Sequence, residues 1–179
     1  MVRRSQRSFH TLLALSLSPL VLLCCAGEPT QGGGSGGGGS PGTPTVELGA
    51  GRTSYEALPE QGATLEIVSG PQGGWHFEHT LLISGFDPEG AVVEYTVQDL
   101  STGANIAFGA VYVLRRKGLV EAEGGQLLRV GDRTVLDIAS PAEVEGRTLE
   151  LRCVASRAGE PFAEDSVRFL ATDEVDELE

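Results

Sequence analysis

A strict alternation of side-chain character over residues 75–83 constrains the fold more than any other feature of the sequence. Side chains at every second position point to one face of an extended strand, whereas a helix repeats after about 3.6 residues. We therefore predict a strand with one buried face. The residues of one face are Trp75, Phe77, His79, Leu81 and Ile83, and those of the other are His76, Glu78, Thr80, Leu82 and Ser84.

The same period recurs along the chain that follows. Short runs rich in Val, Ile, Leu and aromatic residues are separated by clusters of Gly, Pro, Asp and Ser, which favour turns. The predicted strands are residues 63–68, 75–83, 92–97, 105–114, 127–130, 134–138, 148–155 and 166–170. The predicted turns include residues 85–90, 115–118, 131–132, 140–141 and 158–161.

Seven or eight short strands without a long helical period are typical of an all-β fold. We predict a single immunoglobulin-like or fibronectin-like β-sandwich over residues 45–172. A domain of this size buries about two-thirds of its unfolded surface, enough for one core without disulfides. Residues 148–155 and 166–170 resemble the terminal hairpin of such modules. The paired Cys and partner Trp of a true immunoglobulin domain are missing, so the resemblance concerns architecture alone.

The first residues have the composition of a secretory signal peptide. Residues 1–7 are basic, and residues 11–23 are apolar but shorter than the ~20 residues that a membrane-spanning helix needs. We predict a signal peptide over residues 1–25. Residues 26–44 are rich in Gly, Ser and Pro and predict a flexible linker, and residues 173–179 predict an acidic tail.

The end of this segment, Leu22-Leu23-Cys24-Cys25, resembles a bacterial lipobox. We predict Cys25 as the lipidation site because the small Cys24 precedes it, whereas Cys24 itself follows the bulky Leu23. The alternative is ordinary cleavage after Ala26 without a lipid. The resemblance implies a protein anchored at the outer membrane or cell surface, and without the lipid the protein would be periplasmic or secreted.

The net charge of the chain limits the classes of partner that it can bind. The formal net charge is −12, and residues 1–25 contribute only basic side chains, so the remainder is more acidic still. Such a surface repels phosphate backbones, which argues against nucleic-acid binding. The predicted partners are the membrane, through an N-terminal lipid, and an envelope protein or glycan. No cofactor is predicted, and the oligomeric state stays open.

A glycine-rich segment, residues 70–76 with the sequence GPQGGWH, leads into the alternating strand. Together with Gly85-Phe86-Asp87-Pro88 it resembles exported lipoproteins of myxobacterial type, which pair a lipobox and a low-complexity tether with a GxQGGxH segment. The resemblance implies a lipid anchor and implies no activity. The segment lacks the Lys-Ser/Thr of a phosphate-binding loop and precedes a strand, so we predict a sharp turn.

His76 and His79 are the His pair that follows the predicted signal peptide, and they raise the question of a metal site. Three positions apart on a strand, they point to opposite faces and do not chelate one ion. We predict a hydrogen-bonded core position for His79 and a solvent-facing or turn-capping position for His76. The alternative function is an envelope metal-binding protein that uses His76 or His79 with carboxylates. Scattered acids such as Asp132 lack the spacing of a calcium loop and are predicted to be solvated.

Cys153 is in phase with Leu149 and Leu151, and we predict a small buried apolar side chain there. A nucleophilic thiol would need a nearby base, and no His lies close in sequence. No motif of a serine hydrolase, zinc protease or glycosidase can be singled out, so we predict no enzymatic activity. A hydrolase whose site forms only on folding is the less favoured alternative.

These observations favour a non-catalytic module that binds or scaffolds at the cell envelope. We predict that Gln72, Trp75 and His76 form the binding surface, because loop-flanking aromatic and polar side chains are suited to recognition. The alternative for Trp75 is burial, since it is in phase with the core face of its strand.

Overall fold

A computed structural model describes residues 42–71 and 73–173, which all belong to the compact unit Gly38–Glu179. The predicted signal peptide, Cys25, Gln72 and most of the predicted acidic tail lie outside the described residues. The strands are β1 Thr45–Ala50, β2 Glu56–Ala57, β3 Ala63–Glu66, β4 Val68–Ser69, β5 Trp75–Ser84, β6 Val92–Asp99, β7 Ala110–Val113, β8 Val120–Glu121, β9 Leu127–Leu136, β10 Thr148–Arg157 and β11 Glu160–Thr172.

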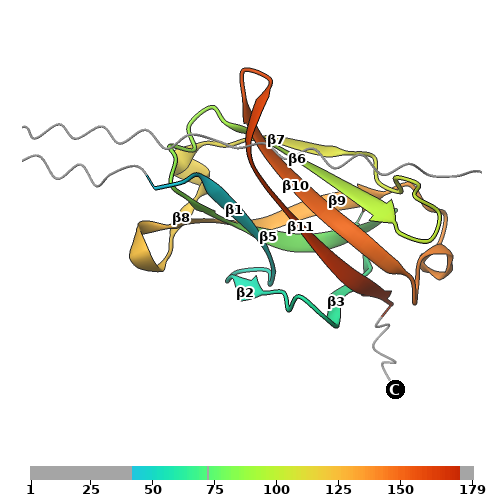
Figure 1. Cartoon of the computed structure of the whole chain (residues 1–179). Coiled ribbons are helices and arrows are strands. Elements are labelled where there is room, and N and C mark those ends of the chain that lie inside the picture. Colours follow the sequence, from blue (N-terminus) through green and yellow to red (C-terminus); the bar gives the residue numbers. More distant parts are fainter. Residues whose placement is uncertain (1–41, 72, 174–179) are drawn as a thin grey trace, which may run out of the picture. The chain divides into compact units, whose positions relative to one another are not determined.

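The described strands form two sheets, as the all-β prediction requires. One sheet has the order β2-β1-β5-β9-β8, with β4 also paired to β5, and the other has the order β3-β11-β10-β6-β7. All pairs are antiparallel except β3 with β11. In Figure 1 the long strands β10 and β11 run across β5 and β9 of the other sheet. In the described part of the chain no helix is long and apolar enough to cross a membrane.

One hydrophobic core fills the space between the sheets. The rings of Phe77 on β5 and Phe169 on β11 meet edge to face, with centroids 4.9 Å apart. Cross-sheet contacts of this kind join side chains that alternate inward along each strand. Buried members from the first sheet include Val46, Leu48, Leu81 and Ile83, and those from the second include Val93, Val97, Leu149, Leu151 and Phe169.

The predicted terminal hairpin is confirmed. Strand β10 pairs with residues 160–170 of β11, with one irregularity after Ala155, and the chain reverses at Ala158 and Gly159, whose φ angles are 53° and 87°. Two successive positive φ values match the twist of a hairpin and favour Gly. The strands extend further than predicted, and Pro161 lies within β11 rather than in the turn.

The predicted turn at residues 131–132 is wrong. Residues 127–130 and 134–138 were expected to be separate strands, but β9 is continuous from Leu127 to Leu136. Opposite β5, His79 pairs with Asp132 and Leu81 with Arg129, so β9 carries one extra residue there. Gly131, with φ 71°, accommodates this β-bulge. The same Gly-Asp pair that suggests a turn therefore serves to redirect a strand.

The predicted strand over residues 105–114 is also too long. Gly109 has φ 68° and interrupts it, so β7 is the only part of it that forms a strand beside β6. Before this break Asn105 makes an isolated bridge to Gln98 of β6. The chain then bonds to the other sheet, where the Phe108 N–H donates to the Val135 carbonyl at 3.0 Å. Phe108, expected on the same face as Tyr112, is 66 % exposed. The predicted strand over residues 63–68 is divided between β3 and β4, which belong to different sheets. The sequence did not predict β1, β2 and β8, because their runs are too brief or too mixed to show a period.

We expect Phe169→Ala to destabilise the fold by about 3–5 kcal/mol, because it removes a fully buried ring and leaves a cavity beside Phe77. Urea unfolding followed by circular dichroism measures the change. Phe108→Ala is the matched control and should change stability by less than about 0.5 kcal/mol, since that ring is exposed. Equal effects of the two substitutions would contradict this placement of the core.

Candidate functional site

The predicted sharp turn before β5 is present. The Gly70 N–H donates to the Gly74 carbonyl at 2.9 Å, and the Gly73 N–H donates to the Gly70 carbonyl at 3.0 Å. Gly73 and Gly74 have φ angles of 80° and 87°, a region that disfavours any residue with a Cβ. The turn delivers Trp75 and His76 to the start of β5.

A hollow of about 300 Å³ lies beside this turn. Trp75 is half-buried on its wall, and His76, Arg133 and Val135 complete the site with Pro71 and the turn glycines. The structure therefore places Trp75 and His76 at this hollow and adds Arg133 and Val135 from β9. We call this hollow the turn hollow; it is lined by Gly70, Pro71, Gly73, Gly74, Trp75, His76, Arg133 and Val135. Arg133 and Val135 were missed because the register between β5 and β9 cannot be read from the sequence.

His76 does not face solvent, which corrects the first of the two positions predicted for it. It is 5 % exposed, because β4 and β9 flank it through Val68 and Val135. The turn also lies against its ring: a Cβ built on Gly70 would be 3.7 Å from His76 Nδ1. The other ring nitrogen, Nε2, points to Glu78 Oε1 at 3.6 Å.

Glu78 is the centre of an ion cluster next to the turn hollow. Arg52 Nε lies 2.5 Å from Glu78 Oε2, and Arg133 Nη2 lies 3.1 Å from Oε1. Arg133 is directly opposite Glu78 on the neighbouring strand, where opposite charges stabilise the pair. Burial by itself would raise the pKa of Glu78, but Arg52, His76 and Arg133 hold it below its usual value. Glu78 is thus a carboxylate that fixes two guanidinium groups.

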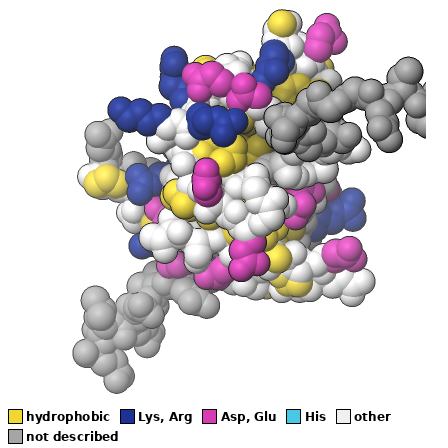
Figure 2. Space-filling view, turned by 90° about the vertical axis from the view of Figure 1, so that its left-hand side faces the viewer, with side chains coloured by type: hydrophobic (Ala, Val, Ile, Leu, Met, Phe, Trp, Pro, Cys, Tyr) yellow, Lys and Arg dark blue, Asp and Glu magenta, His cyan; other side chains and the backbone are white. Residues whose placement is uncertain are grey.

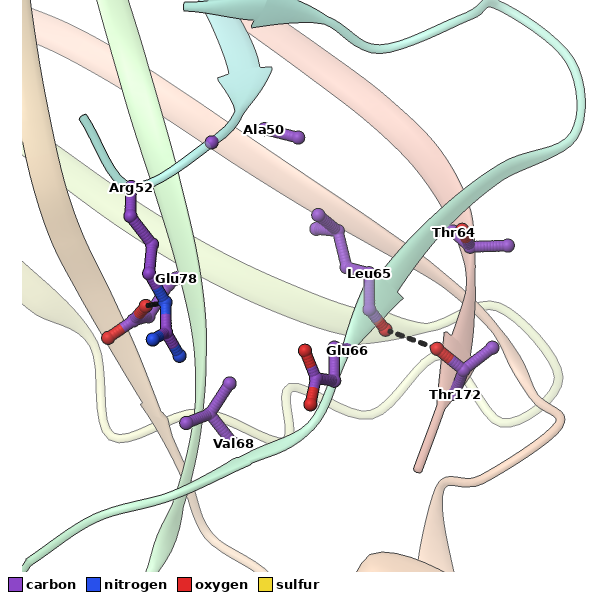
Figure 3. Close-up of a pocket in the computed structure, with 9 residues that line it drawn as sticks. Ala50, Arg52, Thr64, Leu65, Glu66, Val68, Glu78 and Thr172 are labelled. Carbon is purple, nitrogen blue, oxygen red and sulfur yellow. Dashed lines mark hydrogen bonds and ion pairs between the residues drawn. The ribbon is translucent and has the colours of Figure 1, made fainter. Parts of the chain in front are cut away.

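A second hollow, of about 240 Å³, lies on the other side of this cluster. Figure 3 shows Arg52 and Glu78 pointing toward each other on one side, with Leu65 and Thr172 on the opposite side. There the Thr172 hydroxyl donates to the Leu65 carbonyl at 3.4 Å and ties β11 to β3. Glu66 adds a second carboxylate to the lining, whereas the described lining of the turn hollow contains no acidic residue.

His79 occupies the core position that was predicted. It is fully buried, and its Nε2 lies 2.9 Å from the Thr134 hydroxyl. Burial, aided by the positive charge of Arg129, lowers the pKa of His79 to about 3. Its ring packs against Tyr95, with centroids 4.4 Å apart. His76 and His79 lie on opposite faces of β5, and among the described residues no group of three or more His, Cys, Asp and Glu side chains is placed to hold a metal.

Asp132, predicted to be solvated, is 2 % exposed instead. The Tyr95 hydroxyl donates to its Oδ2 at 2.7 Å, and Arg129 Nε lies 2.6 Å from its Oδ1. Burial raises the pKa of Asp132, against the opposing effects of Tyr95 and Arg129. The bulge at Gly131 turns this carboxylate inward, and a lone Gly-Asp pair gives no sequence signal that separates a bulge from a turn.

Cys153 is fully buried among the core residues of β10, as predicted. Burial, followed by the negative charges of Asp165 and Asp132, raises the pKa of the Cys153 thiol. The thiol is therefore protonated and weakly nucleophilic at neutral pH, since the thiolate is the reactive form.

Comparison with known proteins adds no relative: no protein-family model matches the sequence, and no curated protein matches it.

We expect the stability of the fold to depend on pH through His79. The unfolded chain takes up this proton near pH 6.5, while the folded chain does so only near pH 3. Between these values the unfolded state binds more protons, so stability falls with falling pH, by up to about 1.4 kcal/mol per pH unit from this group.

The measurement is urea unfolding at pH 7, 6, 5 and 4 of the natural chain and of His79→Gln. The variant should lose less stability over this range, and the contributions of Asp132 and other carboxylates cancel in the difference. An equal loss of stability with falling pH in the two proteins would show that His79 is not kept neutral in the folded state.

Proposed function

We propose that the protein is an exported, lipid-anchored module that binds a partner at the cell envelope. The N-terminal segment supports export, since a basic start, a short apolar stretch and small residues around Cys25 make up a signal peptide with a lipobox-like end. The glycine-rich residues 26–44 then act as a tether that keeps the module clear of the lipid headgroups.

The module is an immunoglobulin-like sandwich in this proposal. Immunoglobulin domains place their strands in the orders A-B-E-D and G-F-C, and variable-type domains extend the second sheet beyond C. Taken in chain order, β1-β5-β9-β8 corresponds to the first arrangement and β11-β10-β6-β7 to the second. Tyr95 on β6 and Cys153 on β10 are direct cross-strand partners, at strands where an immunoglobulin core carries its Trp and one of its Cys.

The turn hollow is the binding site, and the observation that carries this assignment is its lining. Trp75, partly buried against the core, lines it beside Arg133, which supplies charged donors, while the covered His76 forms part of the wall. None of the described lining residues is acidic. Glu78 occupies only Nε and Nη2 of Arg133, so donors of this guanidinium remain for a ligand. Arg133 is thus the one charged side chain among the described lining residues, in a chain of net charge −12.

These groups suit a carbohydrate that carries a carboxylate. An aromatic ring packs against the apolar face of a sugar, and a guanidinium binds a carboxylate through paired hydrogen bonds. The ligand proposed here is therefore an acidic glycan of the envelope.

Trp75 is the single tryptophan of the chain, so its fluorescence reports directly on the turn hollow. We expect a saturable change when oligogalacturonate is added to the protein, and no comparable change with the methyl ester of the same oligosaccharide, which lacks the charge. Arg133→Gln should weaken binding at least tenfold.

Arg168→Gln is the matched control, because Arg168 forms the same kind of cross-strand pair with Glu150 at 3.1 Å on the other sheet. Its binding should be unchanged. Equal responses to the acid and the ester would contradict recognition of the carboxylate. No saturable response to either would contradict the glycan site itself.

The anchor has an independent test in the intact mass of the protein recovered from bacterial membranes. We expect a species that begins at Cys25 and carries an added lipid mass, and we expect this species to be absent from Cys25→Ser. A lipid-free species that begins near Gly27 would mean that the protein is released rather than anchored.

A further inference from the structure

β7 is an edge strand whose free side carries no protection. It is the last strand of the sheet β3-β11-β10-β6-β7, and in the described chain it pairs with β6 alone. Edge strands expose unpaired N–H and C=O groups, and proteins normally blunt them with charged residues, Pro or bulges. The sequence of β7, Ala-Val-Tyr-Val, contains none of these.

The strands at the other ends of the two sheets show the contrast. β2, β3 and β8 lie there, and each of them carries an exposed glutamate: Glu56, Glu66 and Glu121. β4, which pairs with β5 alone, is uncharged but only two residues long. A charge on an edge disfavours the approach of another strand, because pairing would desolvate it. β7 therefore differs from these three edge strands, because it contains no charged residue.

The free backbone groups of β7 belong to Val111 and Val113. Leu114 donates its N–H to the Ala91 carbonyl at 2.7 Å, on the strand side facing β6. Because bonded and non-bonded pairs alternate along an antiparallel ladder, the N–H and C=O groups of Val113 and Val111 point away from β6. Two residues spaced in this way can accept one further antiparallel strand.

The side chains at this edge are apolar and open to solvent. Val111 is 61 % exposed and Val113 is 53 % exposed, and Phe108 just before the strand is 66 % exposed. Such a cluster on an edge strand marks a surface for association.

We propose that two copies of the chain associate by antiparallel pairing of β7 with β7 about a two-fold axis at Tyr112. This register brings the free N–H and C=O groups of Val111 opposite those of Val113 in the second copy. Each valine then gains an apolar cross-strand neighbour. The contact is isologous, so it closes at the dimer and leaves no free β7 edge.

The charges around β7 favour a second copy as the occupant. Arg115 lies 3.8 Å from Glu89 and Arg116 lies 3.6 Å from Asp87, so two of the three basic residues that follow β7 pair with carboxylates of their own chain. Figure 2 shows one face of the molecule, on which Lys and Arg side chains lie beside Asp and Glu side chains with hydrophobic side chains between them. The residues around β7 thus carry charges of both signs, which do not select a strongly acidic or basic partner strand.

Antiparallel pairing also keeps the basic runs of the two copies apart, since each lies at an opposite end of the joint ladder. The overall negative charge acts mainly over distances that salt screens, beyond about 8 Å at physiological ionic strength. Self-association through β7 is therefore not opposed by local repulsion.

The expected affinity is low. A four-residue edge buries far less than the roughly 1,200 Å² of total surface that stable dimers bury. The dissociation constant should lie between about 10 µM and 1 mM. A membrane anchor, if Cys25 carries the lipid, would hold copies at a higher local concentration, but the pairing itself does not depend on the anchor or on the turn hollow.

Sedimentation equilibrium of residues 26–179, the chain without the predicted signal peptide and without Cys25, tests the pairing. The weight-average mass should rise from the monomer toward the dimer between about 10 µM and 1 mM. Val111→Lys should remain monomeric over the whole range, with an unchanged melting temperature because the side chain is exposed.

Val120→Lys is the matched control, since Val120 is 55 % exposed on β8, an edge strand of the other sheet. It should dimerise like the natural chain. A natural chain that stays monomeric at 1 mM, or dimers that survive Val111→Lys, would overturn the assignment, and so would loss of dimers in Val120→Lys alone.

Amide hydrogen exchange gives a second readout, which distinguishes specific pairing of β7 from non-specific aggregation. Val111 and Val113 should gain protection as the protein concentration rises, whereas Tyr112, already bonded to β6, should be protected at all concentrations. Uniform protection of all three amides, or none at Val111 and Val113, would exclude this register.

Discussion

The hydrogen bond from the Tyr95 hydroxyl to Asp132 joins the two sheets inside the core. The inward position of Asp132 decides which side chains of β9 face outward. A buried carboxylate is costly unless it is paired and hydrogen-bonded, and Arg129 supplies the charge while Tyr95 supplies a donor. The bulge at Gly131 sets the phase of β9 so that Asp132 points inward. Since side chains alternate along a strand, Arg133 then points outward, opposite Glu78.

The two faces of β5 consequently have different roles. Inward, Phe77 and His79 belong to the core, where burial keeps the imidazole neutral. Outward, His76 and Glu78 meet Arg52 and Arg133, and the turn of glycines beside them leaves the hollow open. The backbone bond from Phe108 to Val135 joins this surface to the segment that leads into β7. The proposed ligand site and the proposed dimer edge are therefore linked through this backbone hydrogen bond, yet they use separate residues.

Much of this architecture can be predicted from the sequence, and the reasons are local. The period of two over residues 75–83 and the in-phase Leu149, Leu151 and Cys153 report burial directly, because alternation fixes which side chains share a face. The errors also have a local cause. Gly131-Asp132 and Gly109 supply the same positive φ in a bulge, a break or a turn, and only the surrounding pairing decides which of these forms.

By itself, the sequence determined the all-β class, the terminal hairpin, the core position of His79 and the turn before Trp75, because each follows from periodicity or from the backbone freedom of glycine. Only the tertiary structure decided that Arg52 and Arg133 converge on Glu78, that His76 is covered, and that the uncharged β7 lies at the end of its sheet. These features depend on strand register and sheet order. Strand register and sheet order bring together residues that are distant in sequence, and no local pattern in the sequence specifies which of them meet.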